Sequence, residues 1–201
     1  MAEKNFKNAD QQFITFKELR LDKLDPTSDR TVKRFQASLK AKLKNRDLVI
    51  QRMREVVEIG VGSWALAAIV RIGDAHRDVM EKVLNARIPS GLSMQPEEIT
   101  LVREELKRQA KPILIEAIEA YELCLAKAGE WGVYNQWFQE ARKALQKLAP
   151  ENYPALSLEP PLRLVMPPRV SEPDSAAFEL KVLNELTWKS LALRFGKRPA
   201  P

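Results

Sequence analysis

The sequence is poor in the residues from which most enzyme centres are built. It contains one cysteine, Cys124, and one histidine, His76. A single cysteine cannot form an internal disulfide, and the two residues together cannot supply a zinc site rich in cysteine or histidine. The thiol stands at helical spacing beside Tyr121 and Leu125, which is typical of a small core residue rather than a nucleophile.

Motifs for catalysis are also lacking. No nucleophile elbow is present, and Gly60-Val61-Gly62-Ser63 has neither the third glycine nor the preceding strand of a phosphate-binding loop. His76 lies between Asp74 and Asp78 at a spacing that directs the three side chains apart on a helix, so we expect a packing residue and not a base. We therefore predict that the protein is not an enzyme and needs no cofactor or metal.

Long apolar runs are missing as well. The best stretch, Ile59 to Val70, falls short of the roughly 18 residues that a membrane helix needs. The first ten residues, MAEKNFKNAD, hold no apolar segment, and so we expect neither a transmembrane segment nor a signal peptide in this chain. The compartment stays undecided on these grounds.

What the sequence does contain favours helix. Glycine is scarce, at 7 of 201 residues, and 45% of the chain is apolar. Apolar residues recur at steps of three and four, and this periodicity predicts helices over the ranges 5–19, 28–60, 63–85, 96–110, 113–128 and 133–148. Thr27 or Ser28, and later Ser63, are expected N-caps. Pro112 either kinks a long helix or starts a new one, and Gly129 and Gly132 predict the last turn.

The C-terminal part has a different character. Prolines, including Pro160-Pro161 and Pro167-Pro168, exclude a regular helix over residues 154–173, which we expect to form an extended strap against the body. A last amphipathic helix is predicted from Ser175 to Arg194. The resulting division is an N-terminal helix (1–27), a helical domain (28–153), the strap (154–173), and a C-terminal helix with its tail (174–201).

Charge is unevenly distributed. The net charge of +6 divides into +5 over residues 1–60, −2 over 61–159 and +3 over 160–201. Six basic residues are expected on the outer face of the second helix: Lys33, Arg34, Lys40, Lys42, Lys44 and Arg46. An alternative function is therefore a basic module that binds nucleic acid or an anionic membrane through residues 30–54 and 181–198. The aromatics Phe6, Phe13 and Phe16 fall at core spacing, which favours burial over stacking on bases and makes nucleic acid the less favoured partner.

Two stretches carry a family signature. The run from Trp64 to Gly73, with His76 three residues on, resembles the first helix of a tetratricopeptide repeat, and Ala117, Tyr121 and Cys124 resemble its second helix. Some 40 residues separate these half-signatures, more than the family's spacing, because an extra segment is inserted. The block from Trp64 through Gly132-Val133-Tyr134-Asn135-Gln136-Trp137 to Leu148–Pro154 is similar to the C-terminal part of tetratricopeptide-repeat proteins of bacterial cell envelopes, including gliding-motility machinery.

The resemblance, which covers roughly residues 30–155, implies an all-α array of antiparallel helix hairpins that ends a solenoid. It implies a non-catalytic scaffold or adaptor, in an envelope or motility assembly, that holds other proteins or peptides in a concave groove. Candidate partner-binding residues are polar positions off the core stripe: Arg71, Asn135 and Gln136. Neither the partner nor the oligomeric state follows from the sequence.

Overall fold

The computed structural model describes residues 1–89 and 94–154. These residues form five α-helices and no strand: α1 (Ala2–Glu18), α2 (Asp29–Glu58), α3 (Gly62–Leu84), α4 (Pro96–Trp131) and α5 (Gln136–Leu148). The all-α prediction is confirmed for this part of the chain. The strap and the C-terminal helix predicted beyond Pro154 lie outside the described residues.

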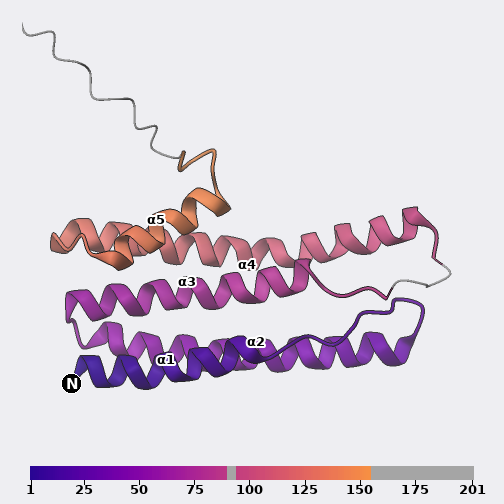
Figure 1. The fold of residues 1–201 in the computed structure, drawn as a ribbon, viewed down its shortest axis with the longest axis horizontal. Helices are drawn as coiled ribbons and strands as arrows, with labels where there is room; N and C mark the ends of the chain where they lie inside the picture. The colour runs from indigo at the N-terminus through magenta and orange to yellow at the C-terminus, as the bar shows by residue number, and fades with distance from the viewer. Residues whose placement is uncertain (90–93, 155–201) are drawn as a thin grey trace, which may run out of the picture. The chain divides into compact units, whose positions relative to one another are not determined.

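The central element is α3, which packs against all four other helices. In Figure 1, α3 runs between α2 and α4, while α1 overlaps α2 and α5 overlaps α4. The ring of Phe6 in α1 lies 5.3 Å from that of Trp64 in α3 and 5.9 Å from that of Trp137 in α5. Hence α1 and α5 cover the same face of the layer formed by α2, α3 and α4.

The amino acids of α3 explain its central position. Six consecutive residues, Ala65 to Val70, are at most 2% exposed, which is possible only for a helix with neighbours on several sides. Small residues let those neighbours approach closely, and the closest approach is at Gly73, where the ring of Tyr121 in α4 occupies the space that a Cβ would need.

The N-terminal helix belongs to the same core. Ala2, Phe6, Ala9, Phe13 and Phe16 are buried at steps of three and four along α1. The expected burial of the three phenylalanines is thereby confirmed, and they are not free to stack on bases. The described residues all belong to one compact unit, which includes α1.

Pro112 lies inside one continuous helix, so of the two predicted alternatives the start of a separate helix at this point is wrong. The proline is exposed. The carbonyl group of Arg108, which loses its backbone partner there, can therefore be hydrated. At the start of the helix, the carboxylate of Glu98 accepts a hydrogen bond from the backbone N–H of Gln95 at 2.9 Å, as in a capping box.

Several predicted boundaries were wrong by a few residues. Val61, not Ser63, is the N-cap of α3, and α4 passes through Gly129 to end at Gly132, whose φ of 67° is left-handed. The last helix begins at Gln136 rather than at Val133. The reason is Asn135, whose side chain accepts hydrogen bonds from the backbone N–H groups of Trp137 and Phe138.

A helix that spans a bilayer must be both long and apolar, and no helix among the described residues meets both requirements.

Candidate functional site

The face of the α2–α3–α4 layer opposite α1 and α5 is not covered by any described helix. It exposes an apolar groove, which we call the α2/α4 groove. Its lining includes five partly buried apolar side chains that pack on the main core: Val32, Leu39 and Val57 from α2, Ile72 from α3, and Val102 from α4. Helical spacing places two more, Leu43 of α2 and Ile113 of α4, in the same stripes. On α2 and on α4 these residues recur at helical spacing, so each helix contributes one stripe.

One end of the groove is a hollow of about 470 Å³. Ile69 and Ile72 of α3 form its floor, with Val57 on the α2 side and Ala120 and Leu123 on the α4 side. Leu123 is 48% exposed, so about half of its side chain remains in contact with water. This end therefore offers apolar surface that the chain's described residues do not bury.

The other end is a hollow of about 400 Å³. Here α2 and α4 extend past the end of α3, and Leu24 fills part of the space between them. The N–H of Leu24 donates to the carbonyl of Arg87 at 2.9 Å, which fixes this loop residue in place. Phe35 and Leu39 line the hollow from α2 and Leu106 from α4.

A charged bridge crosses the groove between the two hollows. Arg46 of α2 contacts the carboxylate of Glu116 in α4 at 3.4 Å, and within the described residues this is the only ion pair that joins the two helices. The same carboxylate lies 2.9 Å from Nδ1 of His76 in α3, within ion-pair distance when the imidazole is protonated. Burial, followed by the positive charge of Arg46, lowers the pKa of His76, while Glu116 opposes the shift.

The two walls of the groove differ in charge. On the α4 side the charged lining residues are Glu105, Glu116 and Glu119. On the α2 side, Arg54 lines the groove and Arg46 reaches into it, with Glu58 as an acidic exception at one end.

Exposed lysines extend this charge along α2. Lys33, Lys40 and Lys44 each follow a groove-lining apolar residue directly in sequence, and all three are exposed. The charged side chains that border the groove are therefore mainly basic on α2 and acidic on α4, where Glu105 also pairs with Arg108 of its own helix at 2.7 Å.

The residues predicted to bind a partner lie elsewhere. Arg71 is on the face covered by α1 and α5, where its guanidinium pairs with Asp10 at 2.7 Å and with Asp74 at 3.0 Å. It also lies 5.2 Å from the ring of Phe13 and 5.1 Å from that of Trp137. These contacts tie α1, α3 and α5 together.

Asn135 and Gln136 lie at the start of α5. The side chain of Asn135 caps that helix and its Nδ2 contacts Ser63 Oγ at 3.1 Å, whereas Gln136 is exposed. The structure brings Arg71 close to the first turn of α5, but none of the three predicted residues lines the α2/α4 groove. The signal that indicates the groove is the width of the apolar stripes on α2 and α4, which exceeds what one packed neighbour can cover.

Lys42 is not on the outer face of α2 as predicted, because it is 1% exposed. Its ammonium lies 2.6 Å from a carboxylate oxygen of Asp78 and donates to the carbonyls of Phe16 at 2.6 Å and Leu19 at 3.1 Å. The last carbonyls of a helix lack backbone partners and carry partial negative charge. Lys42 therefore fastens the end of α1 to α2 and α3, because its long side chain reaches these acceptors.

Burial favours the neutral form of two ionisable side chains in the core. The Tyr121 hydroxyl donates to Asp74 at 2.7 Å, and burial together with that carboxylate raises the pKa of Tyr121. Burial raises the pKa of the Cys124 thiol to about 12, and the side chain is fully buried, as predicted for a core residue. Among the described residues no group of three or more acidic, histidine or cysteine side chains is placed to hold a metal ion.

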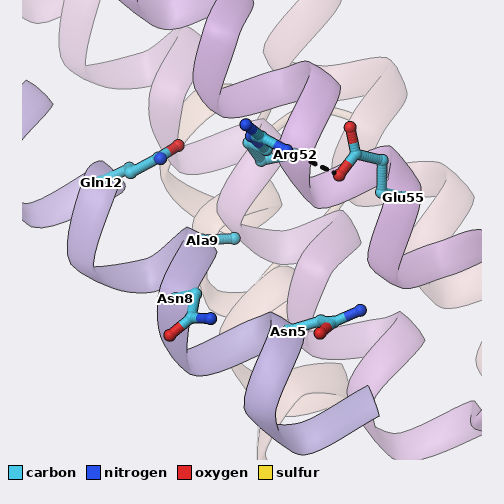
Figure 2. A pocket seen from close by; sticks show the side chains of 6 residues that line it. All are labelled: Asn5, Asn8, Ala9, Gln12, Arg52 and Glu55. Carbon is cyan, nitrogen blue, oxygen red and sulfur yellow. Dashed lines mark hydrogen bonds and ion pairs between the residues drawn. The ribbon is translucent and has the colours of Figure 1, made fainter. Parts of the chain in front are cut away.

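A separate polar cleft of about 490 Å³ lies between α1 and α2 (Figure 2). Three carboxamide side chains from α1, those of Asn5, Asn8 and Gln12, border it opposite Arg52 and Glu55 of α2, which pair with each other at 3.2 Å. All five side chains are exposed. Because water already satisfies such groups, the cleft lacks the buried polar atom that would point to a ligand.

Comparison with known proteins identifies no relative: no protein-family model, no curated protein and no solved structure matches this chain significantly.

Proposed function

We propose that this protein is a non-catalytic adaptor that holds another protein in the α2/α4 groove. The observation that carries the proposal is the row of partly buried apolar side chains between α2 and α4, on a face that no described helix covers. Water contact with such a row is unfavourable by about 25 cal/mol for each Å² of apolar surface, and a bound partner would remove it. Two flanking hollows of about 470 and 400 Å³ provide room for side chains of that partner.

We further propose that the helices of this adaptor are arranged as in a helical-repeat protein. Support comes from α3 and α4, which pack against each other as consecutive helices and approach most closely where Gly73 meets Tyr121. Both residues belong to the stretches that resemble a tetratricopeptide repeat. In this proposal the chain ends a helical array, and its place in a bacterial envelope or motility assembly follows from the resemblance alone.

The test uses a photo-reactive amino acid, p-benzoylphenylalanine, placed in the full chain within cells that produce it. The groove position is Leu123 and the control is Leu48, which is almost equally exposed, at 50% against 48%, but lies on the outer side of α2. We expect irradiation to yield a discrete protein adduct from position 123 and none from position 48. Leu123→Glu should abolish capture of the same protein, which is identified by mass spectrometry, and Leu48→Glu should not. Equal labelling from both positions would contradict the proposal.

The second candidate is binding of nucleic acid or anionic membrane by the outer face of α2. The observation in its favour is that Lys33, Arg34, Lys40 and Lys44 are exposed and form no ion pair with any described residue. Phosphate-driven binding weakens steeply with salt because counterions are released. Retention of duplex DNA or of phosphatidylserine vesicles at 50 mM salt and its loss at 200 mM, with no protein adduct from position 123, would favour this second function.

A further inference from the structure

We infer that the occupant of the α2/α4 groove is an amphipathic α-helix of about 20 residues with acidic side chains along one edge and basic side chains along the other. We also infer that the charges of the two walls set the direction in which this helix lies. The inference rests on the adaptor function proposed above and specifies its partner.

The length of the groove fits a helix. On α4 the lining extends from Leu101 to Leu123, and on α2 it extends from Val32 to Glu58. At 1.5 Å per residue the α4 stretch is about 33 Å long, which a helix of about 20 residues would follow. Since α2 and α4 each run antiparallel to α3, they are parallel to each other, and together with the floor they form a trough between two helical ridges.

The lining favours a helix over an extended peptide. The described walls and floor are α-helices whose backbone groups pair within each helix, apart from the helix ends and the Arg108 carbonyl opposite Pro112, so they offer no sheet edge to which a strand could add. An extended segment would press unpaired N–H and C=O groups against Val57, Ile72 and Leu123, which is costly. A helix satisfies its own backbone and presents a stripe of apolar side chains at steps of three and four.

The bridge between Arg46 and Glu116 divides the apolar lining into two parts. A helix that crosses it therefore needs large apolar side chains near both of its ends and room for polar groups at its middle. A short polar side chain there can hydrogen-bond to the exposed part of the Glu116 carboxylate. The expected apolar stripe is thus interrupted once, at its centre.

Charge complementarity determines the edges. The α2 wall, with Arg46 and Arg54, favours acidic residues on the adjoining edge, and the α4 wall, with Glu105 and Glu119, favours basic residues on the other. Turning a helix end for end while keeping its apolar stripe on the floor exchanges its two edges. For any helix with one acidic and one basic edge, only one direction therefore matches both walls.

The experiment measures the binding of synthetic 20-residue peptides to the full chain by fluorescence anisotropy. Two peptides share the same leucine stripe but have their glutamate edge and lysine edge exchanged, and each carries a photo-reactive group at its N-terminus. We expect similar affinities but labelling at opposite ends of the groove, near Leu123 for one peptide and near Leu101 for the other. A third peptide with glutamate on both edges should bind about tenfold more weakly, because attraction to Glu105, Glu116 and Glu119 is replaced by repulsion between like charges. Labelling at the same end by both peptides, or equal affinity of the third, would overturn the inference.

A charge-exchange variant provides a second readout. In Arg54→Glu/Glu119→Arg, the ends labelled by the first two peptides should become mixed or exchange, while Leu48→Glu should leave them unchanged. Both substituted side chains lie at the rim of the groove, so the fold should tolerate the change. Unaltered direction in this variant would show that wall charge does not orient the helix.

The failures of the two proposals are distinguishable. If no peptide binds but position 123 still forms its protein adduct, the adaptor function stands and the helical occupant is wrong. Two other occupants would also overturn the inference. A synthetic peptide of residues 175–194 that binds the groove more tightly than the designed helices would make the chain's own C-terminal segment the occupant. A concentration-dependent dimer that Leu123→Glu abolishes would make the occupant a second copy.

Discussion

Gly73 of α3 lies directly against the ring of Tyr121 in α4, so that a Cβ built on the glycine would stand 2.7 Å from the nearest ring carbon. The ring cannot move aside easily, because Tyr121 is fully buried and its hydroxyl is hydrogen-bonded to Asp74. The two helices that form the floor and the acidic wall of the groove are therefore held at a separation that only glycine permits.

The first prediction follows from this contact. Gly73→Ala should lower the free energy of unfolding by about 1–3 kcal/mol, because the cost of overpacking outweighs the gain of up to about 1 kcal/mol in helix propensity. Gly129→Ala is the matched control, since it is also within a helix but has no neighbour nearer than the Tyr134 hydroxyl at 4.0 Å. It should be neutral or raise stability by up to about 1 kcal/mol. Urea denaturation of both variants checks this, and equal effects would contradict the role of Tyr121.

Sequence periodicity was sufficient to predict the helices but not their ends or their outer faces. Stripes of apolar residues locate α1, α2 and α3 within a few residues, because burial of one face is a local property of the sequence. Ends depend on single hydrogen bonds, as at Asn135, and continuity through Pro112 depends on which side of α4 meets water.

The candidate site was less predictable for a similar reason. The apolar residues of the groove have the same spacing as core residues, and whether another helix covers them is decided by the tertiary arrangement. Arg71 was singled out as a polar residue off the core stripe, yet its partners Asp10 and Trp137 are distant in sequence. The burial of Lys42 could not be predicted from its own helix either, because the acceptors that surround its ammonium lie in α1 and α3.

Removal of Lys42 is the second prediction. Lys42→Met keeps the length of the side chain but deprives the carbonyls of Phe16 and Leu19 and the carboxylate of Asp78 of a partner. We expect a loss of about 3 kcal/mol of unfolding free energy, near the lower end for a broken buried pair, since Asp78 retains Lys82. Lys40→Met, at an exposed position of the same helix, should change it by less than about 0.5 kcal/mol. Hydrogen exchange should locate the weakening at the C-terminal end of α1, and protection there equal to that of the unmodified protein would count against this role.

The pH dependence of stability gives the third prediction. Burial, which Asp78 partly offsets, lowers the pKa of Lys42 to about 8 from the usual 10.5. Between pH 8 and 9.5 the unfolded state therefore binds more protons at this residue than the folded state, and this residue makes the free energy of unfolding rise with pH. Burial raises the pKa of Cys124 to about 12, and this residue therefore makes the free energy of unfolding fall with rising pH. Its contribution cancels when the unmodified protein is compared with Lys42→Met, because both proteins contain Cys124.

The measurement is urea denaturation of the unmodified protein and of Lys42→Met at intervals from pH 7 to 9.5. The stability advantage of the unmodified protein should grow through this range. The raised pKa of Tyr121 sets the upper limit of the experiment, since ionisation of that residue in the unfolded chain destabilises both proteins near pH 10. An advantage that stays constant to pH 9.5 would show that Lys42 keeps its proton throughout.

The last prediction separates a structural from a binding role for Arg71. Arg71→Lys keeps the charge but loses the planar group that pairs with Asp10 and Asp74 and lies against the rings of Phe13 and Trp137. We expect a loss of about 1–2 kcal/mol in unfolding free energy, because several partly buried contacts weaken together. Binding of the designed helices, and the protein adduct formed from position 123, should be unchanged under conditions in which the variant is fully folded, because Arg71 lies on the face opposite the groove. The converse result, full stability with loss of the adduct, would move the binding surface to the face formed by α1, α3 and α5.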